Sequence, residues 1–308
     1  MTPRERSINV RPMAPRPTGA IDIALVTYDA RPGPTADDQL FVNALTALGA
    51  HVDARSWSDP SASWSRYDAV VVRSCWDYFR RPAAFHSWLD RLEAERAAVH
   101  NPVPTLRWNA DKRYLRDLEA RGVPVVPTHW VPLGAAPSLD DIRCRTGWSE
   151  LVVKPTVSGG AHRTWRSSPG AIGDDARLAE SAAECELMVQ PMLAEIEVDG
   201  EWSLHFFDGA FSHAIVKRPR AGDFRVQLEH GGSVVAVDPA AEMIEAARRA
   251  IDAAPNDGAP PLYARVDGCI VDGAFVLMEL ELLEPALSFS WADGAAERLA
   301  GALLRRLG

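Results

Sequence analysis

The chain has 308 residues, of which 47% are hydrophobic, and carries a formal net charge of -9 at pH 7. This length and composition are typical of a globular protein with roughly two domains. The acidic balance and the lack of a basic block exclude a nucleic-acid interface, because binding to phosphates needs clustered Lys and Arg. No run approaches the roughly 20 apolar residues of a membrane span. Four scattered cysteines indicate free thiols, so we expect a cytoplasmic protein without a nucleic-acid or membrane partner.

The first part of the chain predicts a small α/β domain. Residues 1–19 are rich in Arg and Pro and lack the apolar centre of a secretory signal, so we expect a disordered leader there. Apolar runs and helical periodicity then alternate, which predicts strands at 21–30, 51–57 and 67–74 and helices at 35–50 and 83–98. This alternation predicts an open parallel sheet with helices on its faces. We place this domain at 20–105, with a proline-punctuated exit at 100–108.

The second part predicts a mixed α+β arrangement. Its expected elements are helices at 111–122, 174–184, 238–254 and 294–308 and strands at 123–131, 150–156 and 186–193. Residues 200–218 and 263–284 each contain an Asp-Gly pair between two strand-like runs, which is a strong hairpin signal. Most of the unexpected polar residues of the chain lie in these two hairpins.

The second hairpin places acids in an apolar strand. Because side chains alternate along a strand, Phe275, Leu277, Glu279 and Glu281 are predicted to share one face. Asp267 lies across the turn from Glu279, and three carboxylates on neighbouring strands suit Mg²⁺ or Mn²⁺. The alternative is an acidic sheet face in solvent.

Cations accompany these acids. Arg265 lies on the same strand face as Asp267, and Lys217 lies at the end of another strand. Cations next to carboxylates are expected where both bind one phosphate group. For Lys217, a solvated strand end is an equal alternative. A buried-type strand ends at Lys154 and runs into a loop with Gly159 and Gly160, which can surround phosphates or form a plain turn.

Together, the stretch from 106 to 285 resembles the ATP-grasp carboxylate–amine ligases, the class of D-alanine:D-alanine ligase and bacterial glutathione synthetase. The resemblance implies an ADP-forming C–N ligase with an ATP-grasp fold, in which a substrate carboxylate becomes an acyl phosphate that a nitrogen nucleophile attacks. It implies phosphate contacts from Lys112, Lys154 and the glycine loop at 156–163. It implies adenine contacts from the peptide groups of Gln190, Pro191, Met192 and Leu193, and ribose contacts from Glu201. Arg265 and Lys217 take catalytic roles, and Asp267, Glu279 and Glu281 hold Mg²⁺ or Mn²⁺, with Glu281 standing where Asn is common.

The family resemblance also divides the chain and narrows the reaction. It implies a small ATP-grasp subdomain at 106–187 and a C-terminal subdomain with the metal site at 188–308, preceded by the N-terminal domain. The stretches 70–79, 100–115 and 277–289 look similar to the ligases of antibiotic biosynthesis that include the O-ureido-D-serine cyclo-ligase. The alternatives are an intermolecular amino-acid or γ-glutamyl ligase, a phosphotransferase that stops at phosphorylation, and an inactive nucleotide-binding regulatory protein.

Candidate substrate contacts follow from position. Arg73 emerges at the carboxyl edge of the first sheet and suits a substrate carboxylate, or it pairs with Asp77. Arg225 and His230 lie in a loop that resembles a family loop near the acyl phosphate, and Ser288 is a candidate for a substrate carboxylate. We expect an amino-acid-like small-molecule substrate. Family habit and the apolar helices of the first domain favour a homo-oligomer.

Overall fold

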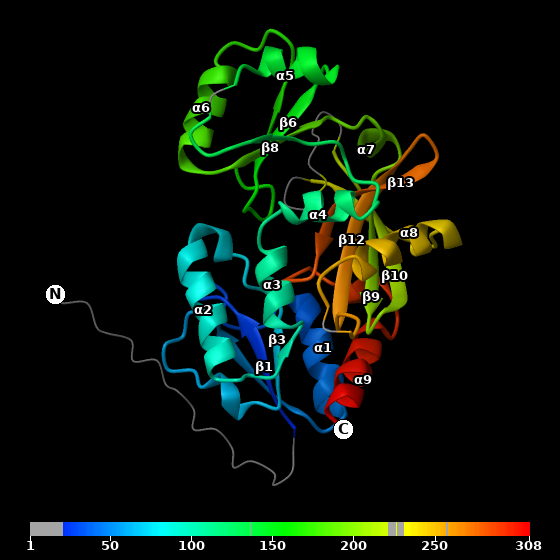
Figure 1. Ribbon diagram of the computed structural model, residues 1–308. Coiled ribbons are helices and arrows are strands. Elements are labelled where there is room, and N and C mark those ends of the chain that lie inside the picture. The colour runs from blue at the N-terminus through cyan, green and yellow to red at the C-terminus, as the bar shows by residue number, and fades with distance from the viewer. Residues whose placement is uncertain (1–20, 136, 221–225, 227–230, 257) are drawn as a thin grey trace, which may run out of the picture.

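The protein is built from three sheets that follow one another along the chain (Figure 1). The computed structural model describes residues 21–135, 137–220, 226, 231–256 and 258–308. The expected leader at 1–19 and the candidates Arg225 and His230 lie outside these residues. The mixture of a parallel sheet with two antiparallel sheets confirms the predicted α/β and α+β class.

The first sheet is parallel, as predicted, with the strand order β2-β1-β3-β4. Its elements are β1 (Asp22–Thr27), α1 (Ala36–Ala47), β2 (His51–Ser56), β3 (Ala69–Val72), α2 (Pro82–Ala94) and β4 (Val99–His100). The Thr35 side chain caps α1 by accepting a hydrogen bond from the Asp38 amide, which satisfies one of the free N–H groups at the start of the helix. β3 is buried along its whole length, as expected for a central parallel strand.

Two short helices connect the first sheet to the rest of the molecule: α3 (Val103–Asn109) and α4 (Tyr114–Ala120). Most of the proline-punctuated exit at 100–108 is the helix α3. Pro102 is the N-cap and Pro104 lies in the first turn of α3, where a proline removes no helical hydrogen bond. The prolines therefore begin this helix instead of interrupting it.

The second sheet is antiparallel and has the order β5-β8-β6-β7. Its elements are β5 (His129–Val131), α5 (Leu139–Thr146), β6 (Leu151–Pro155), β7 (Trp165–Ser167), α6 (Asp174–Glu184) and β8 (Leu187–Pro191). It forms a separate lobe, with its own apolar core between the strands and the two helices (Figure 1).

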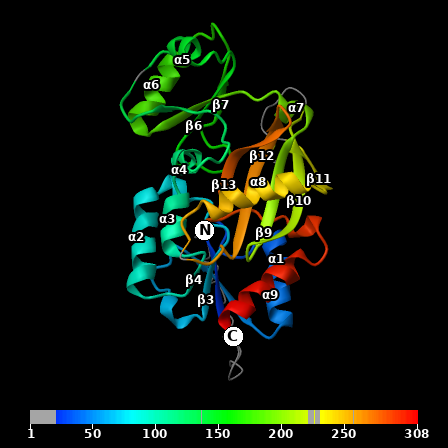
Figure 2. The same ribbon diagram turned by 45° about the vertical axis from the view of Figure 1, so that its right-hand side comes forward.

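The third sheet has the order β11-β10-β9-β12-β13 and is antiparallel throughout. Its elements are α7 (Glu195–Val198), β9 (Glu201–Phe207), β10 (Ala210–Arg218), β11 (Ser233–Val237), α8 (Ala241–Asp252), β12 (Tyr263–Val271), β13 (Ala274–Glu281) and α9 (Ala295–Leu307). α8 lies across one face of this sheet (Figure 2). α9 packs on α1, which joins the end of the chain to the first sheet (Figure 1).

Both predicted hairpins are confirmed. Asp208 and Gly209 have φ of 53° and 76°, and Asp272 and Gly273 have φ of 50° and 79°. Two successive positive φ values are the signature of a type I′ turn, whose twist matches that of the paired strands. The turns fix the register next to them, and a register shift farther along each hairpin, between Phe211 and His213 and between Asp267 and Gly268, sets which polar residues face each other.

Candidate active site

A β-bulge sets the direction in which the two acids of β13 point. Asp267 pairs with Glu279, but Gly268 pairs with Leu277, so Met278 is left over as an extra residue on β13. An extra residue reverses the alternation of side chains beyond it. The prediction that Glu279 and Glu281 continue the face of Phe275 and Leu277 was therefore wrong. The core cluster under α8 contains Phe275, Leu277, Leu280 and Leu282, and the acids lie on the opposite face.

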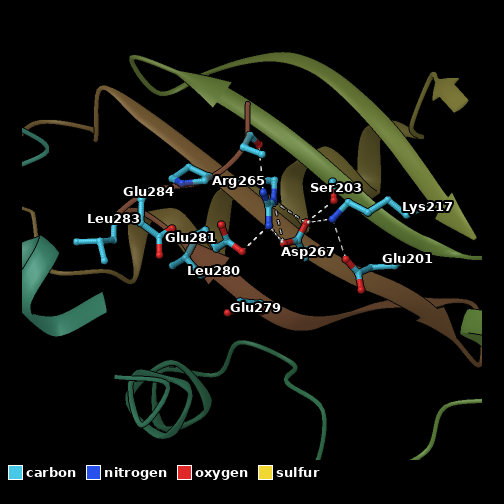
Figure 3. A network of polar contacts seen from close by, with 12 residues as sticks. Glu201, Ser203, Lys217, Arg265, Asp267, Glu279, Leu280, Glu281, Leu283 and Glu284 are labelled. Atoms are coloured by element: carbon cyan, nitrogen blue, oxygen red, sulfur yellow. Dashed lines mark hydrogen bonds and ion pairs between the residues drawn. The ribbon is translucent and has the colours of Figure 1, made fainter. Parts of the chain in front are cut away.

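A network of charged side chains occupies this opposite face (Figure 3). Asp267 is 2% exposed and accepts hydrogen bonds from Arg265 Nε and from Ser203 Oγ. Lys217 Nζ lies 3.5 Å from Asp267 Oδ1 and donates to Glu201 Oε1 at 2.9 Å. Residues predicted from distant parts of the sequence are thus in direct contact on β9, β10 and β12.

The charges of this network support one another. Burial raises the pKa of Asp267, but Arg265 and Lys217 outweigh burial, so the pKa of this carboxyl is lowered. Burial lowers the pKa of Lys217, but Asp267 and Glu201 outweigh it and the net shift is upward. Asp267 and Lys217 are therefore ionised at neutral pH.

The two acids of β13 have different partners. Glu279 Oε1 lies 2.9 Å from Lys112 Nζ, and Lys112 and Lys154 together outweigh burial and lower the pKa of Glu279. Glu281 accepts a hydrogen bond from Arg265 Nη2, yet burial, reinforced by the neighbouring acids, raises the pKa of Glu281 to about 8. A carboxyl with this pKa is mostly protonated at neutral pH unless a further cation approaches.

A fourth acid, which the sequence analysis did not select, borders the same space. Glu284 follows β13 and is partly buried, and its side chain lies next to Glu281 (Figure 3). Burial raises the pKa of Glu284 to about 7, with Glu279 acting in the same direction. Its position three residues after Glu281 could have indicated a place in the site. The direction of a side chain on a loop, however, does not follow from its spacing in the sequence.

The end of β13 is held by buried side chains from earlier in the chain. Asn109 Nδ2 donates to Leu280 O at 2.7 Å, and its Oδ1 accepts from the amides of Leu282 and Leu283 at 2.7 and 3.0 Å. Asn101 Nδ2 donates to Leu282 O, and the Tyr114 hydroxyl accepts from the Leu280 amide. The strand that carries the acids is therefore fixed by the segment that leads from the first sheet into α4.

Two predicted lysines and the glycine loop lie near the acids: Lys154 and the loop belong to the second sheet, and Lys112 belongs to the segment that leads into α4. Lys112 lies just before α4, where its amide donates to Thr156 O and its ammonium donates to Ser158 O at 2.6 Å. Lys154, at the end of β6, makes no hydrogen bond or ion pair with any residue that the structure describes, and burial lowers its pKa. Gly159 packs against Phe79, so close that an added Cβ would lie 3.2 Å from the ring. The loop thus lies over the acid face.

The predicted adenine segment runs from the end of β8 into the following turn. Gln190 is 5% exposed, and its side chain donates to Thr128 Oγ1 at 2.9 Å. The Met192 amide donates to Glu150 O at 2.9 Å. Pro191 ends the strand and Leu193 follows Met192. This segment and Glu201 lie at the junction of the second and third sheets.

Arg73 follows β3 at the carboxyl edge of the first sheet, as predicted, and is bonded within the protein. It is 1% exposed, and its Nε donates to Asp38 at 3.0 Å, so the alternative pairing with Asp77 was wrong. Its Nη2 donates to Pro285 O, and its Nη1 is buried without a partner in the part of the chain that the structure describes. Ser288, with φ of 52°, follows Leu287, whose carbonyl oxygen lies 3.0 Å from His213 Nε2.

Sequence comparisons extend across the chain. A family model for the N-terminal domain of the D-cycloserine synthetase DcsG matches residues 23–101. The cycloserine biosynthesis protein DcsG of Streptomyces lavendulae is 34% identical over 284 residues, which cover 86% of this chain and 92% of that protein. The chain belongs to the DcsG family of ATP-grasp ligases. The crystal structure of D-cycloserine synthetase DcsG superposes with a TM-score of 0.85 at 32% identity and covers 93% of this chain and 100% of that one.

More distant ATP-grasp ligases share the fold. The ATP-grasp ligase PsnB in complex with its minimal precursor has a TM-score of 0.66 at 17% identity, covering 93% of this chain and 99% of that one. D-alanine–D-alanine ligase of Bacillus anthracis, solved with ATP, has a TM-score of 0.63 at 16% identity, covering 94% and 97%. These likenesses and the family membership establish an ATP-dependent carbon–nitrogen ligase. No described helix is long and apolar enough to cross a membrane.

Proposed function

We propose that this enzyme converts O-ureido-D-serine to D-cycloserine by activating the substrate carboxylate with ATP. The observation that carries the proposal is the similarity to DcsG over both the N-terminal domain and the acid-bearing sheet. The nitrogen attached to oxygen would attack the acyl phosphate, which forms the ring amide and releases phosphate. The carbamoyl group would then leave to water as carbamate, so that all atoms balance.

The geometry supports a role for each charged residue in this reaction. Arg265 and Lys217 lie next to Asp267 and would neutralise the transferred phosphoryl group. Lys112 and the unpartnered ammonium of Lys154 would contact the ATP phosphates under the loop of Gly159 and Gly160. Glu201 would hold the ribose, and the turn from Gln190 to Leu193 would hold adenine. The loop would exclude water, which is needed because an acyl phosphate hydrolyses.

The acids fit a divalent metal ion by their chemistry. Among the described residues, no three His, Cys, Asp or Glu side chains are grouped as ready metal ligands, because Asp267 and Glu281 turn to Arg265 and Glu279 turns to Lys112. Burial, with the neighbouring acids acting in the same direction, raises the pKa of Glu281, and a bound Mg²⁺ would favour its ionised form. Asp267, Glu279 and Glu281 would hold the ion, whose charge would polarise the phosphates of ATP.

The substrate side is formed by the first sheet and the loop after β13. Ser288 lies in this loop and would contact a substrate carboxylate. Arg73 has only Nη1 left for such a contact, because its other nitrogens hold Asp38 and Pro285. Arg225 and His230 stay candidates for the acyl phosphate from the sequence pattern alone. A homo-oligomer is likewise proposed on the family resemblance.

The test is a mass-spectrometric assay with ATP, Mg²⁺ and O-ureido-D-serine, with Glu279→Gln as the inactive control. ADP and D-cycloserine that appear only with the intact enzyme support the proposal. ADP with a coupled product from a pool of amino acids replaces it with an intermolecular ligase. Phosphorylated substrate without an amide indicates a phosphotransferase. An absence of ATP turnover with every pool contradicts the assignment of a ligase to this site.

A further inference from the structure

Glu284 differs from the other acids of the site in having no cation partner. Asp267 pairs with Arg265 at 2.9 Å, Glu279 pairs with Lys112 at 2.9 Å, and Glu281 pairs with Arg265. The carboxyl group of Glu284 makes no hydrogen bond or ion pair with any of the described residues. It is only partly buried, so a ligand in the site can reach it.

Two of the nearby cations, Lys112 and Arg265, are already engaged, and the third, Arg73, keeps only Nη1 without a partner among the described residues. Lys112 donates to Ser158 O and pairs with Glu279, and Arg265 binds Asp267, Glu281 and the carbonyl oxygen of Ala286. Neither is free to turn to Glu284 without giving up a short contact. A partly buried carboxylate that lacks a partner is costly, so the arrangement favours a ligand that brings a positive charge.

The backbone holds Glu284 on the substrate side of the site. Trp76 Nε1 donates to Glu284 O at 3.1 Å, and Arg73 Nη2 donates to Pro285 O at 2.7 Å. Both donors follow β3, at the carboxyl edge of the first sheet, where open α/β sheets bind their ligands. Lys154 and the glycine loop come from the second sheet instead, whereas the loop of Glu284 is bonded to the first sheet.

We propose that Glu284 binds the α-ammonium group of an amino-acid substrate and thereby selects substrates that carry this group. The inference rests on the proposed function, because it needs a substrate whose carboxylate is phosphorylated near Arg265. In an α-amino acid the ammonium is attached to the carbon next to the carboxylate, so one carboxylate of the enzyme beside the reacting centre can bind it.

The test compares two substrates with two enzymes. Glu284→Gln keeps the shape of the side chain and removes its charge. KM for O-ureido-D-serine is measured by ADP release, together with kcat/KM for the analogue that lacks the α-amino group, 3-(ureidooxy)propanoate. Glu284→Gln should raise KM for O-ureido-D-serine by about 10- to 100-fold and should remove most of the preference of the wild type for this substrate over the analogue. A variant that merely loosens the fold would impair both substrates alike.

Controls separate the inference from its rivals. Glu186→Gln removes the same charge from an exposed acid paired with Arg113, and KM should stay within about twofold of wild type. ATP binding and its Mg²⁺ dependence, measured without the amino acid, should be unchanged in Glu284→Gln. A weakened Mg²⁺ dependence would make Glu284 a metal ligand, and an unchanged substrate preference would make it a spectator, so either result overturns the proposal.

Failure of the proposed function is visible separately. If the wild type releases no ADP with O-ureido-D-serine, that substrate is wrong, whatever Glu284 does. The comparison is then run with the amino acid that does support ADP release and with its analogue without the amino group. A Glu284→Gln enzyme that keeps the wild-type preference between these two overturns the role of Glu284.

Discussion

Replacement of Asn109 by Leu should destabilise the enzyme strongly, although Asn and Leu have similar shapes. Asn109 is 7% exposed, and its side chain makes three hydrogen bonds to the backbone of the segment that ends β13. The Leu side chain offers no donor or acceptor. Leu280 O and the amides of Leu282 and Leu283 would lose these partners in a buried environment.

The expected loss follows from the number of stranded backbone groups. A buried polar group without a partner costs about 1–3 kcal/mol, and three groups in one segment do not add fully, because the strand end can shift to recover part of the loss. We therefore expect Asn109→Leu to lower the free energy of unfolding by about 3–5 kcal/mol. This is a large part of the roughly 5–15 kcal/mol that stabilises a typical protein.

Urea unfolding followed by circular dichroism measures this loss. Asn43→Leu is the matched control, because Asn43 is exposed on α1 and its amide oxygen accepts a hydrogen bond only from exposed Gln39, so it should change the free energy of unfolding by less than about 0.5 kcal/mol. An Asn109→Leu protein within about 1 kcal/mol of wild type would refute the argument that this side chain fixes the strand of the acids.

Three further predictions address the bulge, the glycine loop and the buried His213. Gly268→Ala should destabilise the fold by about 1–3 kcal/mol in urea unfolding, because its Cβ would lie 2.4 Å from Phe275 Cζ and 2.5 Å from Val276 O; an unchanged midpoint would contradict the bulge. Gly160→Pro should reduce ligation more than ATP affinity, since Gly160 has φ of +57° and proline requires about −65°; equal losses would remove the role of the loop as a cover. Burial lowers the pKa of His213 to about 4, so folding favours the neutral imidazole. The stability that the neutral ring provides is present above the unfolded pKa of about 6.5 and is lost as the pH falls toward 4. His213→Gln should therefore remove up to about 3 kcal/mol of the fall in unfolding free energy between pH 6.5 and 4, and parallel profiles for both proteins would reject this.

The parts of the site that sequence could predict are those fixed by local rules. The Asp-Gly pair at Asp272 and Gly273 selects a type I′ turn, and the turn fixes which residues face each other near it. The predicted pairing of Asp267 with Glu279 is present, but the turn alone would pair Asp267 with Met278, and the bulge at Met278 supplies the remaining shift of one residue. The parallel first sheet was predictable in the same way, because alternation of strand and helix leaves few arrangements.

The parts that sequence missed depend on contacts between distant segments. The bulge at Met278 lies where β13 passes so close to Gly268 that no side chain would fit at position 268. Leu277, next to the bulge, is also hydrogen-bonded to the backbone of Pro124 and Val126 in another segment. The direction of Glu284 is set by contacts of the neighbouring backbone with residues more than 200 positions away. Neither influence has a signal within the hairpin itself.

The contacts of the acids divide the site into two parts that can vary separately. Asp267 is held within the third sheet by Ser203, Lys217 and Arg265, so phosphoryl chemistry needs no contact from the first sheet. Glu284 depends on Trp76 and on its own loop. Substitutions at the carboxyl edge of the first sheet should therefore alter which carboxylate accepts the phosphoryl group more readily than they alter the use of ATP. With Glu284 in its proposed role, the loops that meet at this residue would set the choice of carboxylate while the nucleotide site stays the same.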